Sequence, residues 1–295
     1  MKKTTSKKKN SAGARVLIGI GAAFFIIMLV LPLCEVIYRS LKDGLALYAQ
    51  AITSSYTISA LKVTLIATGV AVLVNTFFGL CASWLLTKFR FKGNRILTTL
   101  IDIPYSVSPV IAGLAFIMTF GRMGWATPAV EWLNNLLGTD IALVFSVPGV
   151  VLATIFVTFP YVSRELIPVM QAQGTDEEEA AALMGAGGFT IFRRITLPQI
   201  RWALVYGVIL CAARAIGEFG AVYAVSKTRG VTFTLPLEID ALYMAGSADS
   251  ITQAFAVSSL LVLLALVMLI LRQLAEYKAK KSDEERNGND VRGNV

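Results

Sequence analysis

The sequence predicts an all-α membrane protein with six transmembrane helices. Hydrophobic residues occupy 56% of the 295 positions and charged residues only 16%, and the mean hydropathy is +0.67. These values lie well outside the balance of a soluble domain. Several apolar runs also approach the roughly 20 residues that cross about 30 Å of hydrocarbon. The bilayer is therefore expected to be the solvent for most of the chain.

Six segments meet this criterion and define a membrane domain over 16–272. A basic tail at 1–15 precedes them, and a charged tail at 273–295, predicted to be disordered, follows them. The first segment is too long for the apolar core of a secretory signal, so we expect it to remain as an anchor. The segments are Val16–Leu33, Val63–Leu86, Val107–Phe120 with an apolar lead-in from Ile96, Ile141–Phe159, Ala203–Ala224 and Ile251–Leu271.

The third segment contains a cluster of helix-breaking residues. Pro104 and Pro109 fall close to Ser106 and Ser108, which predicts a break or kink. At membrane depth a break is tolerated where it is buried in protein or lines a cavity. The alternative is a simple helix start with proline in its first turn.

The distribution of Lys and Arg predicts that both termini are cytoplasmic. Of the 27 basic residues, 20 fall in the two tails, the 88–95 loop and the polar region at 164–201, against five in the alternate segments. By the positive-inside rule, the first set faces the cytoplasm. Apart from Phe89 and Phe91 in the 88–95 loop, the basic clusters have few interleaved aromatic residues, so they indicate orientation by an anionic membrane face and no nucleic-acid partner.

The composition argues against catalysis by this chain. There is no His, which excludes His-based acid–base chemistry and most zinc sites. The three cysteines are far apart and lie in or beside apolar runs, so no disulfide framework is implied. No G-x-x-x-x-G-K-[ST] phosphate loop is present. No catalytic, metal or cofactor site is therefore predicted.

A polar hairpin at about 171–200 separates the fourth and fifth segments. Thr175 and Glu178 have the spacing of a capping box. The helix they begin should run to about Met184, where Gly185 would adopt the left-handed conformation. This unit is expected to lie outside the membrane.

The second half of the hairpin predicts an aromatic knob. Phe189, Phe192 and Ile195 recur at three-residue spacing on a second short helix, which Pro198 should close. Phenylalanines exposed to water are unfavourable without a partner, so a docking surface is the better interpretation. An amphipathic linker lying on the bilayer is the alternative.

Two opposite charges fall inside the fifth segment. Arg214 and Glu218 are four residues apart and are expected on one helix face. An ionisable group at this depth normally faces a bundle interior or an aqueous path. One interpretation is an ion pair that fixes helix packing. The other places these two residues beside a translocation path or gate, together with Ser106, Ser108 and Pro109.

The hairpin resembles the EAA loop of membrane subunits in binding-protein-dependent ABC importers. The resemblance implies a type I ABC importer permease fold in a bacterial cytoplasmic (inner) membrane, with the hairpin as a coupling helix that docks on a cytoplasmic ABC ATPase dimer. ATP and Mg would be bound by that partner, and Phe189 and Phe192 would share the docking surface. The matching positions are Glu179, Ala180, Ala181, Gly185, Ile195, Leu197 and Pro198.

Other stretches resemble the tetrahedral-oxyanion branch of these importers, which carries sulfate, molybdate and tungstate. They are Arg214–Ala221, Asp102–Pro104 and Val107–Gly113, and the run from Arg193 to Leu204 is most similar to W-type permeases of sulfate/thiosulfate importers. This resemblance implies a homologous T-type permease and an extracytoplasmic sulfate/thiosulfate-binding protein as partners. A molybdate/tungstate permease is the alternative.

An ion-coupled secondary transporter is the alternative from another class. It would predict paired intramembrane carboxylates and an internal repeat. The chain has one intramembrane acid, Glu218, and no convincing repeat, so the importer interpretation is preferred.

Overall fold

The computed structural model describes residues 12–89 and 91–293. Most of the basic tail predicted for residues 1–15 lies outside the described residues, as does Arg90 of the 88–95 loop. Every regular element in the described part is helical. The predicted all-α class is therefore confirmed.

Five helices are long and apolar enough to cross a membrane, and a bent pair of helices forms a sixth candidate span, Asn94–Ser106 with Pro109–Phe120. The predicted number of spans therefore matches the structure. The five are Gly13–Leu41, Ser55–Lys88, Val147–Gln173, Gly188–Ile216 and Ala248–Ala279.

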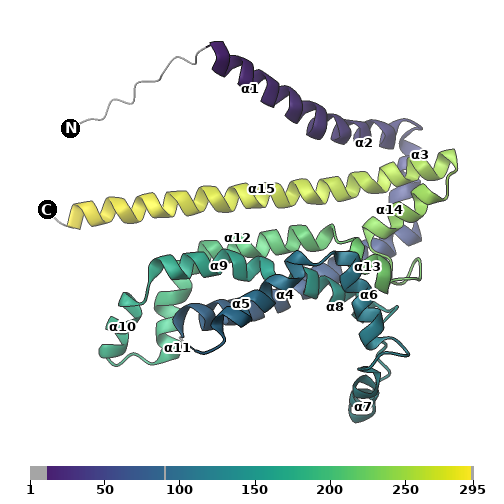
Figure 1. The fold of residues 1–295 in the computed structure, drawn as a ribbon. Helices are drawn as coiled ribbons and strands as arrows, with labels where there is room; N and C mark the ends of the chain where they lie inside the picture. The colour runs from purple at the N-terminus through teal and green to yellow at the C-terminus, as the bar shows by residue number, and fades with distance from the viewer. Residues whose placement is uncertain (1–11, 90, 294–295) are drawn as a thin grey trace.

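The helices of the central bundle run side by side, and the hairpin extends from one end (Figure 1). Helix α4 (Ser55–Lys88) packs against α8 (Val147–Thr158), α9 (Pro160–Gln173) and α12 (Leu197–Ile216). One hydrophobic cluster joins residues of α4 and α8 such as Ala67 and Val150. This bundle fixes the hairpin relative to the spans.

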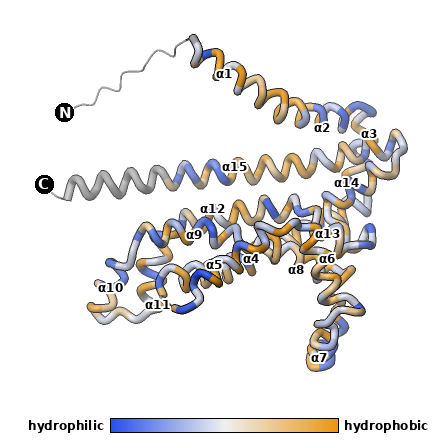
Figure 2. The backbone as a smooth tube through the Cα atoms, in the orientation of Figure 1, coloured by the Kyte–Doolittle hydropathy of each residue, from blue (hydrophilic) through white to orange (hydrophobic). Residues whose placement is uncertain are grey.

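The first span lies apart from the bundle over most of its length (Figure 1). It comprises α1 (Ala12–Phe25), the π-helical turn η1 (Ile26–Val30) and α2 (Leu31–Leu41). Only α2 packs closely on α15 (Ala248–Gly293), and none of the apolar window of this span is buried. Figure 2 shows α1 as a largely hydrophobic rod, as expected for a lipid-facing anchor. Helix α3 (Leu45–Thr53) follows it.

The predicted break in the third span is confirmed. Helices α5 (Asn94–Ser106) and α6 (Pro109–Phe120) meet at an angle of 108°. Val107 and Ser108 between them have extended backbones with ψ of 138° and 131°. Pro109 disfavours helical geometry in the residue before it and cannot donate a backbone hydrogen bond. The alternative of a simple helix start is therefore wrong.

The fourth span begins six residues later than predicted and is longer. Helix α8 starts at Val147, and the helical run continues through α9 to Gln173. The hydroxyl of Ser146 caps its start by accepting a hydrogen bond from the N–H of Gly149 at 3.2 Å. Hydropathy alone placed the start at Ile141 because the residues before the cap are also apolar.

The fifth span is shifted in the opposite direction. Its helix ends at Ile216, and the predicted segment to Ala224 contains a break followed by the short helix α13 (Gly220–Val225). Gly217 follows the last helical turn and weakens its continuation.

Helices α7 (Thr127–Leu137) and α14 (Leu235–Met244) lie away from the hairpin, whereas α15 runs along the length of the molecule (Figure 1). Helix α7 protrudes from the bundle, and α14 packs on α4 and α15. The tail at 273–295 was predicted to be disordered, but helix α15 continues through it to Gly293. Extending an existing helix is much less costly than nucleating one.

Candidate functional site

The turn of the hairpin has the predicted backbone. Helix α10 (Asp176–Leu183) ends in a motif where Gly185 has φ of +87°. The N–H of Gly185 donates to the carbonyl of Ala182 at 2.9 Å, and that of Ala186 donates to Ala181 at 3.0 Å. This pair of bonds satisfies the last carbonyls of the helix and requires a left-handed residue at Gly185.

The exposed apolar tip of the hairpin differs from the predicted aromatic knob. Leu183, Met184 and Phe189 are 91%, 82% and 76% exposed, and Figure 2 shows hydrophobic segments at the tip between α10 and α11 (Gly188–Ile191). Phe192 instead packs on Trp84 of α4, with ring centroids 5.5 Å apart. The prediction that Phe192 belongs to an exposed knob is therefore wrong, because the ring turns toward the bundle.

The predicted capping box is also wrong. The side chain of Thr175 makes no capping bond to the backbone of α10; its hydroxyl donates to the carboxylate of Glu179 at 2.7 Å. Glu178 points away from Thr175 and toward the bundle. The ammonium of Lys88 in the bundle offers Glu178 a stronger hydrogen bond than a neutral backbone N–H.

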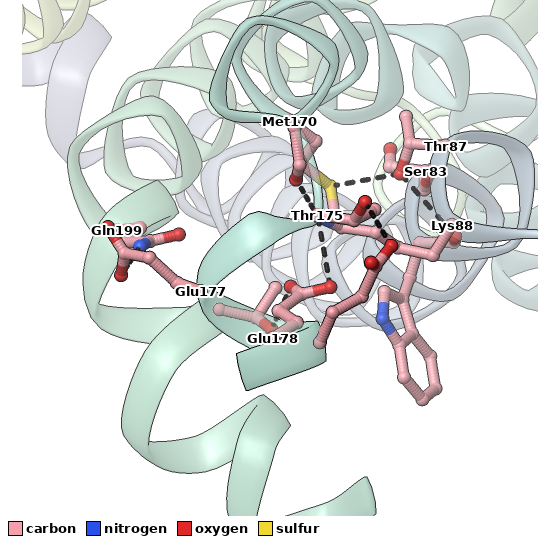
Figure 3. Close-up of polar contacts among 12 residues, drawn as sticks. Ser83, Thr87, Lys88, Met170, Thr175, Glu177, Glu178 and Gln199 are labelled. Carbon is pink, nitrogen blue, oxygen red and sulfur yellow. Dashed lines mark hydrogen bonds and ion pairs between the residues drawn. The ribbon is translucent and has the colours of Figure 1, made fainter. Parts of the chain in front are cut away.

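Glu178 joins the hairpin to two spans (Figure 3). One carboxylate oxygen lies 3.1 Å from the Nζ of Lys88, in the last turn of α4. The other accepts a hydrogen bond from the hydroxyl of Thr196 at 2.6 Å. The side chains of Lys88 and Glu178 are only 8% and 15% exposed. We call these three residues, Lys88, Glu178 and Thr196, the hairpin clamp.

Two further bonds support the hairpin clamp. The ammonium of Lys88 donates to the carbonyl of Gly174 at 2.6 Å, which satisfies the chain just before α10. Gln199 of α12 donates to Glu177 at 2.5 Å. The first turn of α10 is therefore fixed both to α4 and to α12.

The second half of the hairpin is continuous with the fifth span. Helix α11, the π-helical turn η2 (Phe192–Thr196) and α12 form one helical run over Gly188–Ile216. Pro198 therefore does not close the hairpin as predicted. It lies in the first turn of α12, immediately after η2. A π-helical turn changes the local hydrogen-bond pattern, which accommodates the missing N–H of the proline.

The residues that match the EAA pattern occupy both faces of the hairpin. Ala181 is buried, and Ile195 and Leu197 are half-buried toward the bundle. The exposed matches are Glu179, Ala180, Gly185 and Pro198. The pattern therefore combines packing positions with an outward surface.

Arg214 and Glu218 form the predicted ion pair, although Glu218 lies beyond the helix that carries Arg214. Glu218 is 1% exposed, and its second oxygen accepts a hydrogen bond from the N–H of Ala221 at 2.8 Å. The carboxylate thus connects the end of α12 to the first turn of α13. The pair lies in the break between these helices.

The structure brings Pro109 to this break. A Cβ added at Gly220 would lie 3.0 Å from the Cβ of Pro109, so the start of α13 packs closely on the start of α6. Ser106 and Ser108 are exposed next to this contact along the chain. In the described part of the chain, the hydroxyl of Ser106 donates to the carbonyl of Asp102 at 3.4 Å, and neither serine forms a hydrogen bond with Arg214 or Glu218.

Sequence reasoning missed two sets of residues. The hairpin clamp was hidden because Glu178 fits a local capping pattern. Asn75 is fully buried in α4 and donates to the carbonyl of Ile155 at 3.1 Å and to the hydroxyl of Thr158 at 2.8 Å. A single amide in an apolar segment was the available signal, since buried polar groups join spans by hydrogen bonds.

Comparison with protein families gives a match over residues 75–281. The matching model is described as "Binding-protein-dependent transport system inner membrane component". The chain belongs to this family. It is therefore a membrane-spanning transport component and not an enzyme. The matched region begins at the buried Asn75 and includes the hairpin.

Relatives of the chain cover almost all of its length. It is 42% identical over 273 residues to the sulfate transport system permease protein CysW of Escherichia coli K12, covering 92% of this chain and 91% of the relative. It is 41% identical to CysW of Synechocystis, with coverage of 89% and 92%. The identity to CysT of Escherichia coli K12 is 34%, with coverage of 74% and 76%.

Solved structures share the fold. A bacterial ABC transporter that imports alginate gives a TM-score of 0.73 at 17% identity, covering 90% of this chain and 94% of that chain. The MetNI methionine ABC transporter gives 0.54 at 20% identity, with coverage of 75% and 94%. These likenesses confirm an ABC importer permease fold.

Proposed function

We propose that this chain is the membrane-spanning subunit of an ATP-driven importer for sulfate and thiosulfate. The structural observation that carries the proposal is the continuous helix Gly188–Ile216, which joins the exposed hairpin tip to the Arg214–Glu218 pair. At 1.5 Å per residue this run spans about 43 Å. A displacement of the hairpin would therefore reach the charged break without an intervening loop.

The substrate assignment is supported by the relatives named as sulfate transport permeases. Their identity of about 40% extends over nearly the whole chain. Molybdate and tungstate share the tetrahedral dianion geometry of sulfate, so they are the alternative substrates. Selection among them would rest largely with a separate extracytoplasmic binding protein.

The hairpin would lie in the cytoplasm, with both termini on the same side, in agreement with the distribution of basic residues. The exposed Leu183, Met184 and Phe189 would enter a cleft of a cytoplasmic ATPase dimer. That partner would bind ATP and Mg. A homologous T-type permease would complete the pathway. The 34% identity to a CysT protein supports the homology of the two permeases.

The test is transport by the purified complex in vesicles. This chain, the second permease, the ATPase and the sulfate-binding protein are reconstituted with ATP and Mg inside the vesicles. We expect uptake of labelled sulfate that requires ATP and is reduced by excess thiosulfate. Uptake driven by an ion gradient without ATP would contradict the importer mechanism. Stronger competition by molybdate at low concentration would instead assign the alternative substrate.

A further inference from the structure

The loop that follows α13 places two basic residues at the end of the molecule opposite the hairpin (Figure 1). Lys227 and Arg229 lie two and four residues beyond the end of α13 at Val225. Helix α13 itself begins next to Glu218, which pairs with Arg214. With six residues at 1.5 Å each, α13 separates its two ends by about 9 Å. Basic side chains therefore flank both ends of this short helix.

Arg229 is neutralised by a buried carboxylate. Its guanidinium binds Glu238 of α14 through two nitrogens, with distances of 2.9 and 2.6 Å. These hydrogen bonds raise the pKa of Arg229 above its ordinary value. The guanidinium also lies over the ring of Tyr56, 4.7 Å from its centroid. Bidentate pairing of this kind fixes the loop to α14 and compensates the charge.

Lys227 is held in a different way. Its ammonium lies 4.7 Å from the ring centroid of Phe145, and no described carboxylate forms an ion pair with it. An aromatic ring attracts a cation through its quadrupole but carries no net charge. Phe145 can therefore position the ammonium without cancelling its field.

The backbone of Phe145 is strained where it supports Lys227. Phe145 is the one described residue other than glycine with a positive φ, at +58°. Its N–H donates to the carbonyl of Val225 at 2.9 Å, which joins the chain before α8 to the end of α13. A bulky residue in this conformation costs about 1–2 kcal/mol, and such strain is concentrated at functional sites.

The acidic residues on this side of the membrane increase the effect that an unpaired cation would have on a dianion. The segments expected on the opposite face of the membrane from the hairpin contain acidic residues such as Glu131, Asp140 and Asp249. They contain five basic residues, and two of these, Arg39 and Arg229, are paired with carboxylates. A dianion delivered to such a surface by the binding protein would be repelled. A local positive field at the mouth of the pathway would offset this repulsion.

We infer that Lys227, positioned by the ring of Phe145, receives the tetrahedral dianion at the outer mouth of the pathway, before the dianion reaches Arg214. The inference rests on the proposed function, since it requires that an oxyanion crosses this chain. Lys227 supplies a charge that is accessible from outside. Arg214, paired with Glu218, supplies the second charge at the break between α12 and α13.

The experiment measures initial sulfate uptake in vesicles of neutral phosphatidylcholine at several ionic strengths. We expect Lys227→Gln to lower the rate about tenfold at low salt and to flatten its dependence on ionic strength. Lys227→Arg should retain most of the rate. Phe145→Leu, which keeps the apolar bulk but removes the ring, should lower it about threefold. Lys42→Gln serves as the control because Lys42 is the other lysine predicted at that end.

Assembly and basal ATP hydrolysis are measured for every variant and should be unchanged. A rate and salt dependence for Lys227→Gln equal to those of the wild type would overturn the inference. A deficit that appears only when the vesicles contain phosphatidylglycerol would also overturn it, because the lysine would then bind a lipid phosphate. Wild-type vesicles that take up neither sulfate, thiosulfate, molybdate nor tungstate would refute the proposed function itself, and the inference with it.

Discussion

The ammonium of Lys88 lies 3.1 Å from the carboxylate of Glu178 and joins the last turn of α4 to the first turn of α10. Thr196 binds the other oxygen of the same carboxylate. A hairpin that appears in sequence as an independent polar insertion is thus attached to two spans by one side chain.

Removal of one member of the hairpin clamp should destabilise the chain. Glu178→Ala leaves the ammonium of Lys88 mostly buried without its partner, at a cost of about 3 kcal/mol. Thermal unfolding in detergent measures the effect. Glu179→Ala is the matched control, because Glu179 is exposed, and should change stability little. The double variant Lys88→Met/Glu178→Leu should be more stable than the two single variants predict by addition; strict additivity would show that the pair does not interact.

Gly185→Ala should weaken the hairpin through its backbone alone. Nothing lies within 4 Å of an added Cβ, but φ is +87°, and an alanine there costs about 1–2 kcal/mol. We expect weaker co-purification with the ATPase. Gly187→Ala is the control, since Gly187 has equal space and φ of −70°. Equal effects of the two substitutions would argue against a conformational role for Gly185.

Phe189 and Phe192 should have separable effects. Phe189→Ala removes an exposed side chain, so the isolated chain should keep its stability while its affinity for the ATPase falls. Phe192→Ala removes the contact with Trp84 and should lower the stability of the chain by about 2 kcal/mol. Unfolding curves and ATPase pull-down measure the two quantities. Full ATPase binding by Phe189→Ala would remove Phe189 from the docking surface.

The ion pair of Arg214 and Glu218 can be tested for structure and transport separately. Arg214→Ala should impair assembly because it leaves the buried carboxylate of Glu218 unpaired. The double variant Arg214→Met/Glu218→Gln removes both charges, and the glutamine oxygen can still accept from the N–H of Ala221. We expect assembly to recover and sulfate uptake to remain low. Recovered uptake would limit the pair to a packing role.

Gly113→Ala should disrupt the contact between α6 and α13. An added Cβ would lie 2.6 Å from the carbonyl oxygen of Ala221 and 2.7 Å from the Cβ of Ala224, so the helices would have to separate. We expect a loss of about 2 kcal/mol in unfolding stability. Gly69→Ala in α4 has nothing within 4 Å and should be neutral or slightly stabilising. A neutral Gly113→Ala would mean that the two helices need not pack so closely.

Local composition and chain geometry were sufficient to predict several features of the protein. Long apolar runs required six spans because backbone groups must bond internally in lipid. Pro109 required the break in the third span, and Gly185 required the turn of the hairpin. The spacing from Glu179 to Pro198 resembled a family of importer permeases to which the chain belongs.

The partners of several side chains depended on how distant segments of the chain pack together. Glu178 had a suitable local partner in the first turn of α10, but Lys88, distant in sequence, offered a stronger charged bond in a poorly solvated position. Phe189 and Phe192 are equivalent in helical periodicity, but only Phe192 packs against the ring of Trp84. Lys227 and Arg229 have the same charge and lie in the same loop. Packing placed the carboxylate of Glu238 beside Arg229 and the ring of Phe145 beside Lys227. Such choices depend on contacts between distant segments, whose energies are absent from any local pattern.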